Sequence, residues 1–496
     1  MNIIDILIII AYFIMLVLIG LYVAKKHVRS GNDAAVAGRS LGAFMGGIGK
    51  AANSAGGSTS VGGTSWGYQL GIAAVWYSVG EGLAYWAFLW LVKRQWRALF
   101  RSRANTVGSF FGYRWGKFGQ AYVGIINTIS YVAFVAAQII ATATVIKVLM
   151  GWDYNVSLFV STGIIIFYCA AGGLRAIVLT DVIQMAIIIV GMLFVLPPII
   201  FKKAGDALGG GGLSTVWDTL KNTDVTNFMT HLDAPGVFGW LYVIGAIVIP
   251  CLLIGICMQA PYQYQASIKS ADAAFKSYLS VPILYIPAAI MVVLIGMCAV
   301  MLYGADFMPA AYGGPADGSG DPNMVLPTII KEFLPTGLVG LLLAAVLSAT
   351  MSTSSTCLIC ATTSFTDDVV NPFLKKKLDN KKSLLLFRCS MVGLGFSTIL
   401  ITLWANDIIK LITETYAAAV SALAFPIFMT LFWKKATKVG TFTTMIASAI
   451  IYYAVQFGGD AIGLNPNLVA APLFVAFPAS VVIMLVVSFA TQKTST

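Results

Sequence analysis

The sequence predicts an all-α membrane protein that crosses the bilayer about thirteen times. Of its 496 residues, 58% are hydrophobic and only 10% are charged, whereas a soluble domain carries about 25% charged residues. The apolar residues gather in long segments, each able to supply the roughly 20 residues that a membrane helix needs. The basic residues gather in alternate loops between these segments, which is typical of multi-pass membrane proteins.

Thirteen segments have the length and apolar character of a membrane-spanning helix, and we number them spans 1 to 13. They comprise residues 3–24, 43–69, 72–92, 119–149, 155–171, 176–201, 236–260, 277–303, 336–364, 384–404, 408–432, 440–457 and 471–490. The chain is therefore expected to form a single transmembrane domain over residues 1–496, without a soluble domain.

The positions of the 31 Lys and Arg residues predict the orientation in the membrane. The loops after odd-numbered spans hold 24 of them, the loops on the opposite side hold six, and Lys50 lies within a span. Because basic loops stay on the cytoplasmic side, we expect the N-terminus outside the cell and the C-terminus inside, in the cell membrane. The net charge of +11 then reflects contact with the lipid bilayer, and no nucleic acid is implied.

The first span and the longer connecting segments have distinct compositions. Span 1 lacks a basic stretch before it and runs into two lysines, so we expect a retained helix and not a cleaved signal peptide. Residues 105–118 are amphipathic and are predicted to lie on the cytoplasmic membrane surface. The outer loops 202–235 and 304–335 are rich in Gly, Asp and Pro, which fits either lids or flexible connections.

Two spans are predicted to be interrupted. Residues 51–65 in span 2 concentrate Gly, Asn and Ser, which disfavour a continuous helix, and span 7 contains Pro250, Gly255 and Pro261. The two spans are five apart, so they occupy equivalent places if spans 2–6 and 7–11 are inverted repeats. Paired breaks of this kind indicate the central site of a transporter. Alternatively, the glycines only permit close helix packing.

A run of hydroxyl side chains in span 9 indicates a cation site. Six of the seven residues from Thr350 to Thr356 carry a hydroxyl. Polar groups in lipid are costly unless they are satisfied, and oxygen atoms are the ligands that hard cations prefer. On a helix, Ala349, Ser352 and Thr353 share one face. With carbonyl groups freed by the break in span 2, this face predicts an oxygen cage for Na⁺, although interhelical hydrogen bonds are the alternative.

Short motifs along nearly the whole chain carry a family resemblance. They are Gly38-Arg-Ser-Leu-Gly42, Gly67-Tyr-x-x-Gly71 with Tyr77, Gly172-Gly-x-x-Ala176, Thr180-Asp181-x-x-Gln184, Ala349-x-x-Ser352-Thr353, Thr366-Asp-Asp368 and Phe432-Trp-Lys-Lys435. Through them the chain resembles the solute:sodium symporter family, which includes sodium-coupled sugar, proline, pantothenate and sialic acid carriers.

The resemblance implies a leucine-transporter-type fold with a five-plus-five inverted repeat core. The first repeat would comprise residues 43–201 and the second 236–432, with one extra helix at 3–24 and two more at 440–490. It also implies sodium-driven uptake by alternating access. In two places the chain departs from patterns in the family, with Ser54 where some relatives have Asp, and Gln265-Ala266 where many have Gln-Arg.

The resemblance further implies the sodium ligands. The main site would use the carbonyls of Ala52, Ala55 and Ala349 and the hydroxyls of Ser352 and Thr353. The counterparts of a second site found in some relatives are Asp181, Ser355 and Thr356, so either one or two sodium ions are compatible with the chain.

The solute is expected at mid-membrane between the two breaks. The candidate binding residues are Ser58, Thr59, Ser60, Tyr77, Glu81, Gln138 and Gln259. Lys50 either extends to the cytoplasmic interface or places its ammonium near the cation site, where it competes with or replaces an ion and pairs with Asp181. Because no other basic residue lies deep in a span, a neutral, zwitterionic or cationic solute is favoured over a strongly anionic one.

These patterns predict a sodium-coupled symporter that imports a small polar organic solute. A proton-coupled carrier of the same fold is the main alternative, because Lys50 can take the place of an ion. A solute sensor is disfavoured, since we expect it to carry a signalling domain after the last span. An enzyme is not expected, because histidine metal motifs and paired catalytic carboxylates are missing, and Cys357 and Cys360 fit small apolar filler. No obligate protein partner is implied.

Overall fold

The structure is a computed structural model in which the chain is almost entirely helical. It describes residues 2–27, 30–102, 104–223, 226–233, 239–309, 314–315, 319–376, 378–403 and 407–492. Within these residues, extended pairing is confined to one parallel bridge between Leu41 and Ile268. The bridge joins the segments that flank two of the interrupted helices described below.

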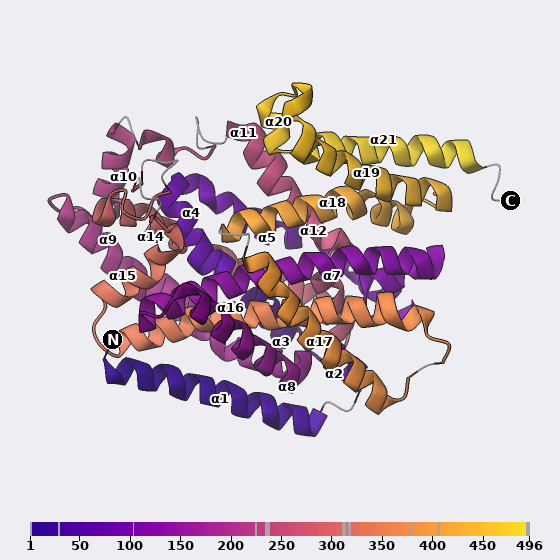
Figure 1. The fold of residues 1–496 in the computed structure, drawn as a ribbon, viewed down its shortest axis with the longest axis horizontal. Coiled ribbons are helices and arrows are strands. Elements are labelled where there is room, and N and C mark those ends of the chain that lie inside the picture. Colours follow the sequence, from indigo (N-terminus) through magenta and orange to yellow (C-terminus); the bar gives the residue numbers. More distant parts are fainter. Residues whose placement is uncertain are drawn as a thin grey trace.

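The α-helices follow one another closely along the chain. They are α1 (Ile3–His27), α2 (Gly31–Val36), α3 (Ala43–Ser54), α4 (Gly63–Leu70), α5 (Val75–Ala87), α6 (Leu89–Ser102), α7 (Val107–Met150), α8 (Tyr154–Ile189), α9 (Leu196–Ala207), α10 (Gly212–Asn222), α11 (Gly239–Tyr242), α12 (Ile249–Cys257), α13 (Gln259–Ser267), α14 (Ala271–Tyr303), α15 (Val325–Phe333), α16 (Leu338–Thr363), α17 (Asn380–Thr402), α18 (Ile408–Phe432), α19 (Lys438–Gly458), α20 (Pro466–Ala470) and α21 (Leu473–Thr491). Several of the long helices, α1, α7 and α16 among them, run roughly along the longest axis of the molecule (Figure 1).

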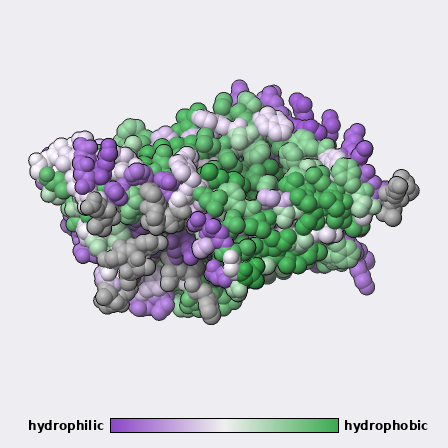
Figure 2. Space-filling model, turned by 90° about the horizontal axis from the view of Figure 1, so that it is seen from above, coloured by the Kyte–Doolittle hydropathy of each residue, from purple (hydrophilic) through white to green (hydrophobic). Residues whose placement is uncertain are grey.

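The surface has the hydropathy pattern of a membrane protein. The face seen in Figure 2 is apolar over its middle and carries hydrophilic residues at both ends of the long axis. Apolar side chains that are exposed in the absence of lipid include Leu18, Phe194, Leu400 and Phe489. A band of this kind buries its apolar area in the hydrocarbon core of a bilayer, which confirms the predicted class of fold.

The described parts of all thirteen predicted spans are mainly helical. Ten helices in the described chain are long and apolar enough to cross a membrane. The other three predicted spans are interrupted or short. Span 2 is divided between α3 and α4, span 3 between α5 and α6, and span 5 forms the apolar stretch Tyr154–Phe167 at the start of α8. The count of thirteen crossings and the orientation therefore remain predictions.

The interruption predicted in span 2 is present. Helix α3 ends at Ser54, and the chain continues through a wide helical turn, η2 (Ser58–Gly62), into α4. Gly56 and Gly57 lie at the break, and a Cβ atom on either would press against side chains of α16 or α7. The glycines therefore permit close packing at the point where the helix is broken. Both interpretations of the glycines, a helix break and close helix packing, thus apply.

The interruption in span 7 lies at Met258. Its backbone is extended, with φ −90° and ψ 148°, and it separates α12 from α13. Pro250 lies where the wide helical turn η6 (Val243–Val248) passes into α12, within a continuous helical stretch, so it does not cause the break. The first amides of α13 instead find partners on α7. Gln259 N donates to Asn127 Oδ1 at 2.8 Å, and Ala260 N donates to the Tyr131 hydroxyl at 2.7 Å.

The amphipathic segment 105–118 is the arm that opens α7. The helix begins at Val107 and bends at Gly116, where φ is +81°. The Arg114 guanidinium donates to backbone carbonyls around the end of α18, namely those of Thr430, Trp433, Lys434 and Ala436. The arm is thus bound to the protein, and its place on the cytoplasmic membrane surface stays a prediction.

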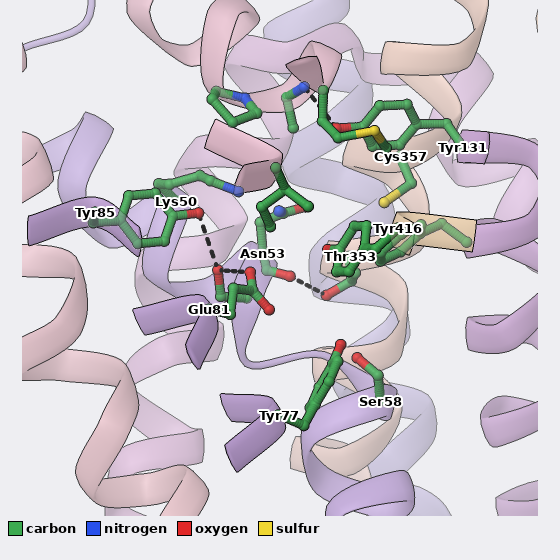
Figure 3. Close-up of a pocket in the computed structure, with 16 residues that line it drawn as sticks. Lys50, Asn53, Ser58, Tyr77, Glu81, Tyr85, Tyr131, Thr353, Cys357 and Tyr416 are labelled. Atoms are coloured by element: carbon green, nitrogen blue, oxygen red, sulfur yellow. Dashed lines mark hydrogen bonds between the residues drawn. The ribbon is translucent and has the colours of Figure 1, made fainter. Parts of the chain in front are cut away.

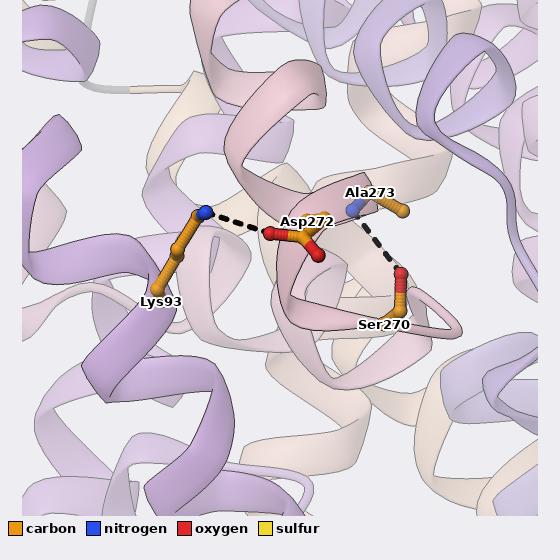
Figure 4. Close-up of polar contacts among 4 residues, drawn as sticks. All are labelled: Lys93, Ser270, Asp272 and Ala273. Carbon is orange, nitrogen blue, oxygen red and sulfur yellow. Dashed lines mark hydrogen bonds and ion pairs between the residues drawn. The ribbon is translucent and has the colours of Figure 1, made fainter.

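One exposed ion pair joins α6 to the start of α14. Lys93 Nζ lies 2.6 Å from Asp272 Oδ1, and the neighbouring Ser270 caps α14 by accepting from Ala273 N (Figure 4). Both charged side chains are largely open to solvent, so the pair adds little to stability.

The two long outer loops contain helices that the composition did not reveal. Helix α10 lies in the first loop and α15 in the second. Parts of both loops, residues 224–225, 234–235, 310–313 and 316–318, lie outside the described residues. Their role as lids stays a prediction.

Candidate functional site

A small cavity lies where the two interrupted helices meet. Its volume is about 20 Å³, roughly the space that one ordered water needs. The lining residues come from α3, η2, α5, α7, α12, α13, α16 and α18 and from the break at Met258. They are Lys50, Asn53, Ser54, Ser58, Tyr77, Glu81, Tyr85, Tyr131, Phe134, Ile254, Met258, Ala260, Pro261, Thr353, Cys357 and Tyr416. A solute of several heavy atoms therefore enters only when lining side chains move.

Both charged groups of the cavity come from neighbouring helices. Lys50 lies one turn before Ser54 on α3, and Glu81 lies on α5 (Figure 3). The side chains are only 3% and 4% exposed. Ser54 Oγ donates to Glu81 Oε1 at 2.7 Å and lies 3.5 Å from the Tyr85 hydroxyl. A carboxylate thus stands beside the break even though position 54 carries no acid.

The Lys50 ammonium lies against aromatic rings. Its nitrogen is 5.5 Å from the centre of the Tyr85 ring and 5.7 Å from that of Tyr264. Attraction to a ring face contributes when the ammonium is removed from water. The group does not reach the protein surface, which excludes extension to the cytoplasmic interface. Among the described residues, neither Asp181 nor Glu81 comes within ion-pair distance of it, so the pairing with Asp181 is not formed.

The opposite wall of the cavity is aromatic. Tyr131 and Phe134 come from α7 and Tyr416 from α18, and the rings of Phe134 and Tyr416 lie 4.7 Å apart. Thr353 and Cys357 of α16 complete this side (Figure 3). The cavity is therefore a polar corner around Glu81 and Lys50 that faces an apolar, π-rich wall.

The hydroxyl face of α16 lies against the break after α3, as the sequence predicted. Thr353 Oγ1 donates to the carbonyl of Asn53 at 2.8 Å. A Cβ atom on Gly56 would collide with Thr353, which shows how closely the two elements approach. Ala52 precedes Asn53 and Ala55 follows it by two positions, and the part of their carbonyls as sodium ligands stays a prediction. Ala349 lies one turn before Thr353 on α16, and from this position we infer that its carbonyl is a further candidate ligand.

The composition of this region fits an alkali cation. Within the described residues, no group of three or more His, Cys, Asp or Glu side chains is placed to hold a metal ion. The donors that do converge are hydroxyl and carbonyl oxygens. Such neutral oxygen ligands suit a hard cation and offer little to a transition metal.

Asp181 lies directly behind this face. Ser352 Oγ donates to Asp181 Oδ1, and Asp181 is fully buried. Its other oxygen, Oδ2, has no hydrogen-bond partner among the described residues. A buried carboxylate oxygen without a partner is costly, and a cation supplies the missing interaction. Asp181 thus fits a cation site better than it fits local helix capping.

The other two residues of the predicted second site differ in orientation. Thr356 Oγ1 lies 3.4 Å from the Tyr264 hydroxyl, which in turn donates to the carbonyl of Gly49. A Cβ atom on Gly49 would lie 3.4 Å from Asp181 Oδ2, so these groups are neighbours. Ser355 Oγ instead donates to carbonyls of its own helix, those of Met351 and Ser352.

Among the seven predicted solute-binding residues, Ser58, Tyr77 and Glu81 line the cavity. Thr59 and Ser60 do not. The Thr59 hydroxyl contacts the carbonyl of Ser54 and the Tyr285 hydroxyl, and Ser60 donates to the carbonyl of Gly56. Both stabilise the wide turn that follows the break.

The two predicted glutamines also lie outside the cavity lining. Gln138 Oε1 accepts from Gly57 N at 2.7 Å, so it satisfies an amide that the break exposes. Gln259 Oε1 accepts from Val107 N at 3.0 Å and therefore anchors the first turn of α7. Both residues position backbone segments, and their part in binding solute stays a prediction.

Some lining residues could have been found from helical spacing alone. Asn53 and Ser54 follow Lys50 by three and four positions, Tyr85 follows Glu81 by four, and Cys357 follows Thr353 by four. Cys357 therefore lies at the cavity, where the sequence suggested apolar filler. Tyr131, Phe134 and Tyr416 gave no such signal, because aromatic residues in an apolar helix are equally typical of helix packing.

Comparison with known proteins identifies the family to which the chain belongs. The profile of the Sodium:solute symporter family matches residues 35–448. The osmoregulated proline transporter OpuE of Bacillus subtilis is 24% identical over 454 residues, which cover 88% of this chain and 86% of its own. The high-affinity proline transporter PutP of the same organism is 24% identical, with 97% of each chain covered. A sodium/proline symporter of Staphylococcus aureus is also 24% identical, covering 97% of this chain and 92% of its own.

Solved structures show the same fold. A Na⁺-coupled sialic acid symporter in a substrate-bound, outward-open state matches with a TM-score of 0.81 at 19% identity, covering 98% of each chain. The nucleobase-cation-symport-1 transporter Mhp1, in a closed conformation, matches with a TM-score of 0.58 at 12% identity, covering 93% of this chain and 95% of its own. The chain belongs to the Sodium:solute symporter family and is a multi-pass transporter of the cell membrane, not an enzyme.

Proposed function

We propose that the protein imports a small polar organic solute together with Na⁺ by alternating access. The observation that carries this proposal is the contact of Thr353 with the Asn53 carbonyl, because it brings the hydroxyl face of α16 to the break in span 2. Sodium is bound there by the carbonyls of Ala52, Ala55 and Ala349 and by the hydroxyls of Ser352 and Thr353. The solute occupies the adjoining cavity between Lys50, Glu81 and the aromatic wall.

A second sodium ion is proposed at Asp181. Its unpartnered oxygen and its bond to Ser352 support a site that Thr356 completes, while Ser355 joins after its hydroxyl turns from its own helix. Ser352 lies between the two sites, so the ions are coupled through one hydroxyl. The ion at Asp181 supplies the counter-charge that the buried carboxylate lacks.

Alternating access requires gates on both sides of the cavity. On the predicted cytoplasmic side, residues 104–107 are held from three directions. Arg39 donates to Ala104 O and Asn105 Oδ1, Thr106 Oγ1 donates to Asp368 Oδ1, and Val107 N donates to Gln259 Oε1. On the predicted outer side, α4, α7 and the segment around Asp321 border a cavity of about 480 Å³. This difference supports a conformation that is closed toward the cytoplasm.

Uptake into proteoliposomes tests the proposal. We expect accumulation of a radiolabelled solute to require an inward Na⁺ gradient and to be lost when K⁺ replaces Na⁺. Full uptake driven by a pH gradient alone, with Na⁺ absent, would contradict it and favour the proton-coupled alternative. Substrate names of the relatives, proline above all, define the first solutes to try.

A further inference from the structure

The central cavity is lined by one cationic and one anionic side chain that do not form an ion pair with each other. Lys50 and Glu81 line the same space of about 20 Å³. The ion pair recorded among the described residues joins Lys93 to Asp272, so the Lys50 nitrogen and the Glu81 oxygens lie farther apart than 4.0 Å. Both groups attract each other across the cavity without direct contact.

Each group has binding capacity left over. An ammonium donates three hydrogen bonds, whereas within the described residues the Lys50 ammonium meets the Tyr85 hydroxyl and the ring faces of Tyr85 and Tyr264. Glu81 accepts from Ser54 through one oxygen, whereas a carboxylate accepts about four hydrogen bonds. Buried charges are costly unless paired and fully hydrogen-bonded. The cavity therefore favours a guest that supplies an acceptor to Lys50 and a donor to Glu81.

The aromatic wall adds to the preference for a positive group. Tyr77, Tyr131 and Tyr416 surround the side of the cavity that Glu81 faces (Figure 3). Ring faces attract ammonium groups, including quaternary ones that cannot donate hydrogen bonds. A carboxylate of the guest is repelled from this side and finds its only cationic partner in the cavity lining at Lys50.

We propose that the transported solute is a zwitterion, bound with its carboxylate at Lys50 and its ammonium at Glu81. This inference rests on the proposed function, since it names the solute of that same site. The guest inserts between two charges that already attract each other, so it must supply both partners at once. A neutral solute, or one with a single charge, leaves at least one buried charge without a counter-charge.

Binding of matched analogues to the purified protein in Na⁺ tests the charge requirement. The probes are L-proline, glycine betaine and β-alanine as zwitterions, cyclopentanecarboxylate with the carboxylate alone, proline methyl ester with the amine alone, and glucose as a neutral solute. We expect at least one zwitterion to bind, and its singly charged analogues to bind about a hundredfold more weakly. Equal binding of analogues and zwitterion, or binding of glucose alone, would overturn the proposal.

Variants assign each charge to its partner. Lys50→Met is expected to weaken the zwitterion about a hundredfold while proline methyl ester, which lacks the carboxylate, loses little. Glu81→Gln is likewise expected to weaken the zwitterion about a hundredfold, while cyclopentanecarboxylate, which lacks the amine, loses little. Lys410→Met is a matched control, because Lys410 is exposed at the start of α18, and it should bind as wild type does. If both single variants weakened all probes alike, the assignment of charges would be wrong.

Failure of this inference can be told apart from failure of the proposed function. The shift in melting temperature caused by Na⁺ alone is measured in wild type, Lys50→Met and Glu81→Gln, which also reports folding. A sodium-induced shift without binding of any zwitterion refutes the solute class and leaves sodium coupling standing. Zwitterion uptake that ignores Na⁺ and follows a pH gradient refutes sodium coupling and leaves the solute class standing.

Discussion

Ser54 shows how a single position can redistribute charge around the site. Some members of the family are expected to carry Asp there. In this chain the Ser54 hydroxyl donates to Glu81, so the carboxylate is contributed by α5 and lies beside the break, not on it. Negative charge is thereby kept close to the predicted sodium ligands but also within reach of the solute. A carboxylate placed in this way suits an ammonium group as well as it suits a metal ion.

The hydroxyls of α16 allow a direct test of the sodium site. Removing one oxygen ligand in Ser352→Ala or Thr353→Ala leaves the cation with one ligand fewer and should raise the Na⁺ concentration for half-maximal uptake about tenfold or more, which corresponds to about 1.4 kcal/mol or more. Ser354→Ala is the control, because the Ser354 hydroxyl donates to Thr350 O within its own helix. Sodium dependence is measured at saturating solute.

An unchanged sodium dependence in both Ser352→Ala and Thr353→Ala would argue against the proposed ligands. A parallel change in Ser354→Ala would show that the helix, and not the individual oxygen atoms, is responsible.

Much of this residue-level chemistry follows from the sequence, and the remainder has a physical reason. Ser352 and Thr353 were predictable because adjacent hydroxyls in an apolar helix need a partner. Gln138 and Gln259 were equally good candidates as amides in predicted spans, yet in the structure their side chains accept hydrogen bonds from the backbone, at the break in span 2 and at the first turn of α7. An amide side chain satisfies an exposed N–H as readily as a solute, so sequence alone does not separate these roles.

At the scale of elements, the breaks depend on small residues and on neighbours. The break in span 2 was predictable from Gly56 and Gly57 with adjacent Asn and Ser. The break at Met258 was only bracketed by Gly255 and Pro261, because its position depends on Asn127 and Tyr131 of α7, which receive the first amides of α13. Partners on a distant helix leave no mark in the local sequence.

Gly57 provides a test of the break that is free of backbone strain. Its φ and ψ, −60° and −31°, are helical, yet an added Cβ would lie 2.6 Å from Thr350 Cγ2 and 2.7 Å from Ala141 Cβ. Overpacking of this kind costs about 1–3 kcal/mol. We expect Gly57→Ala to push η2 away from α16 and to weaken Na⁺ binding about tenfold, measured by sodium-dependent thermal stabilisation.

Gly63→Ala is the matched control. Gly63 has the same helical conformation, with φ −63° and ψ −40°, but no atom lies within 4 Å of an added Cβ. It should bind Na⁺ as wild type does or be slightly stabilised. If Gly57→Ala also bound Na⁺ normally, close approach at the break would not be needed for the site.

At the scale of the whole molecule, the hydropathy of the chain predicts the class of fold well. Every predicted span is mainly helical in its described part, because burying backbone in lipid leaves few alternatives to a helix. The sequence was less informative for α10 and α15 in the outer loops. These helices are short and lack the long apolar signal of a span, so their positions depend on packing against the rest of the protein.

The orientation is a prediction of the charge distribution and can be measured. In a Cys389→Ser background, which removes the exposed cysteine, Lys221→Cys and Lys434→Cys each place one new thiol in opposite predicted loops. A membrane-impermeant maleimide added to intact cells should label the first variant and not the second. Labelling of Lys434→Cys alone would reverse the assignment. If both variants were labelled only after lysis, the accessibility of the thiols in intact cells would be in question, and a permeant maleimide checks it.

The opposite charges in the central cavity have an electrical consequence. Lys50 and Glu81 together carry no net formal charge, and a zwitterionic solute adds none, so the only net charge moved in a cycle is that of sodium. A membrane potential of 100 mV contributes about 2.3 kcal/mol per elementary charge, which corresponds to about fiftyfold in the concentration ratio of the solute. In the proposed cycle with one sodium ion, transport is thus driven by the voltage in addition to the sodium gradient, and a second ion at Asp181 squares the factor that the voltage contributes. The resting potential of the cell would then set how scarce a solute this protein can still collect.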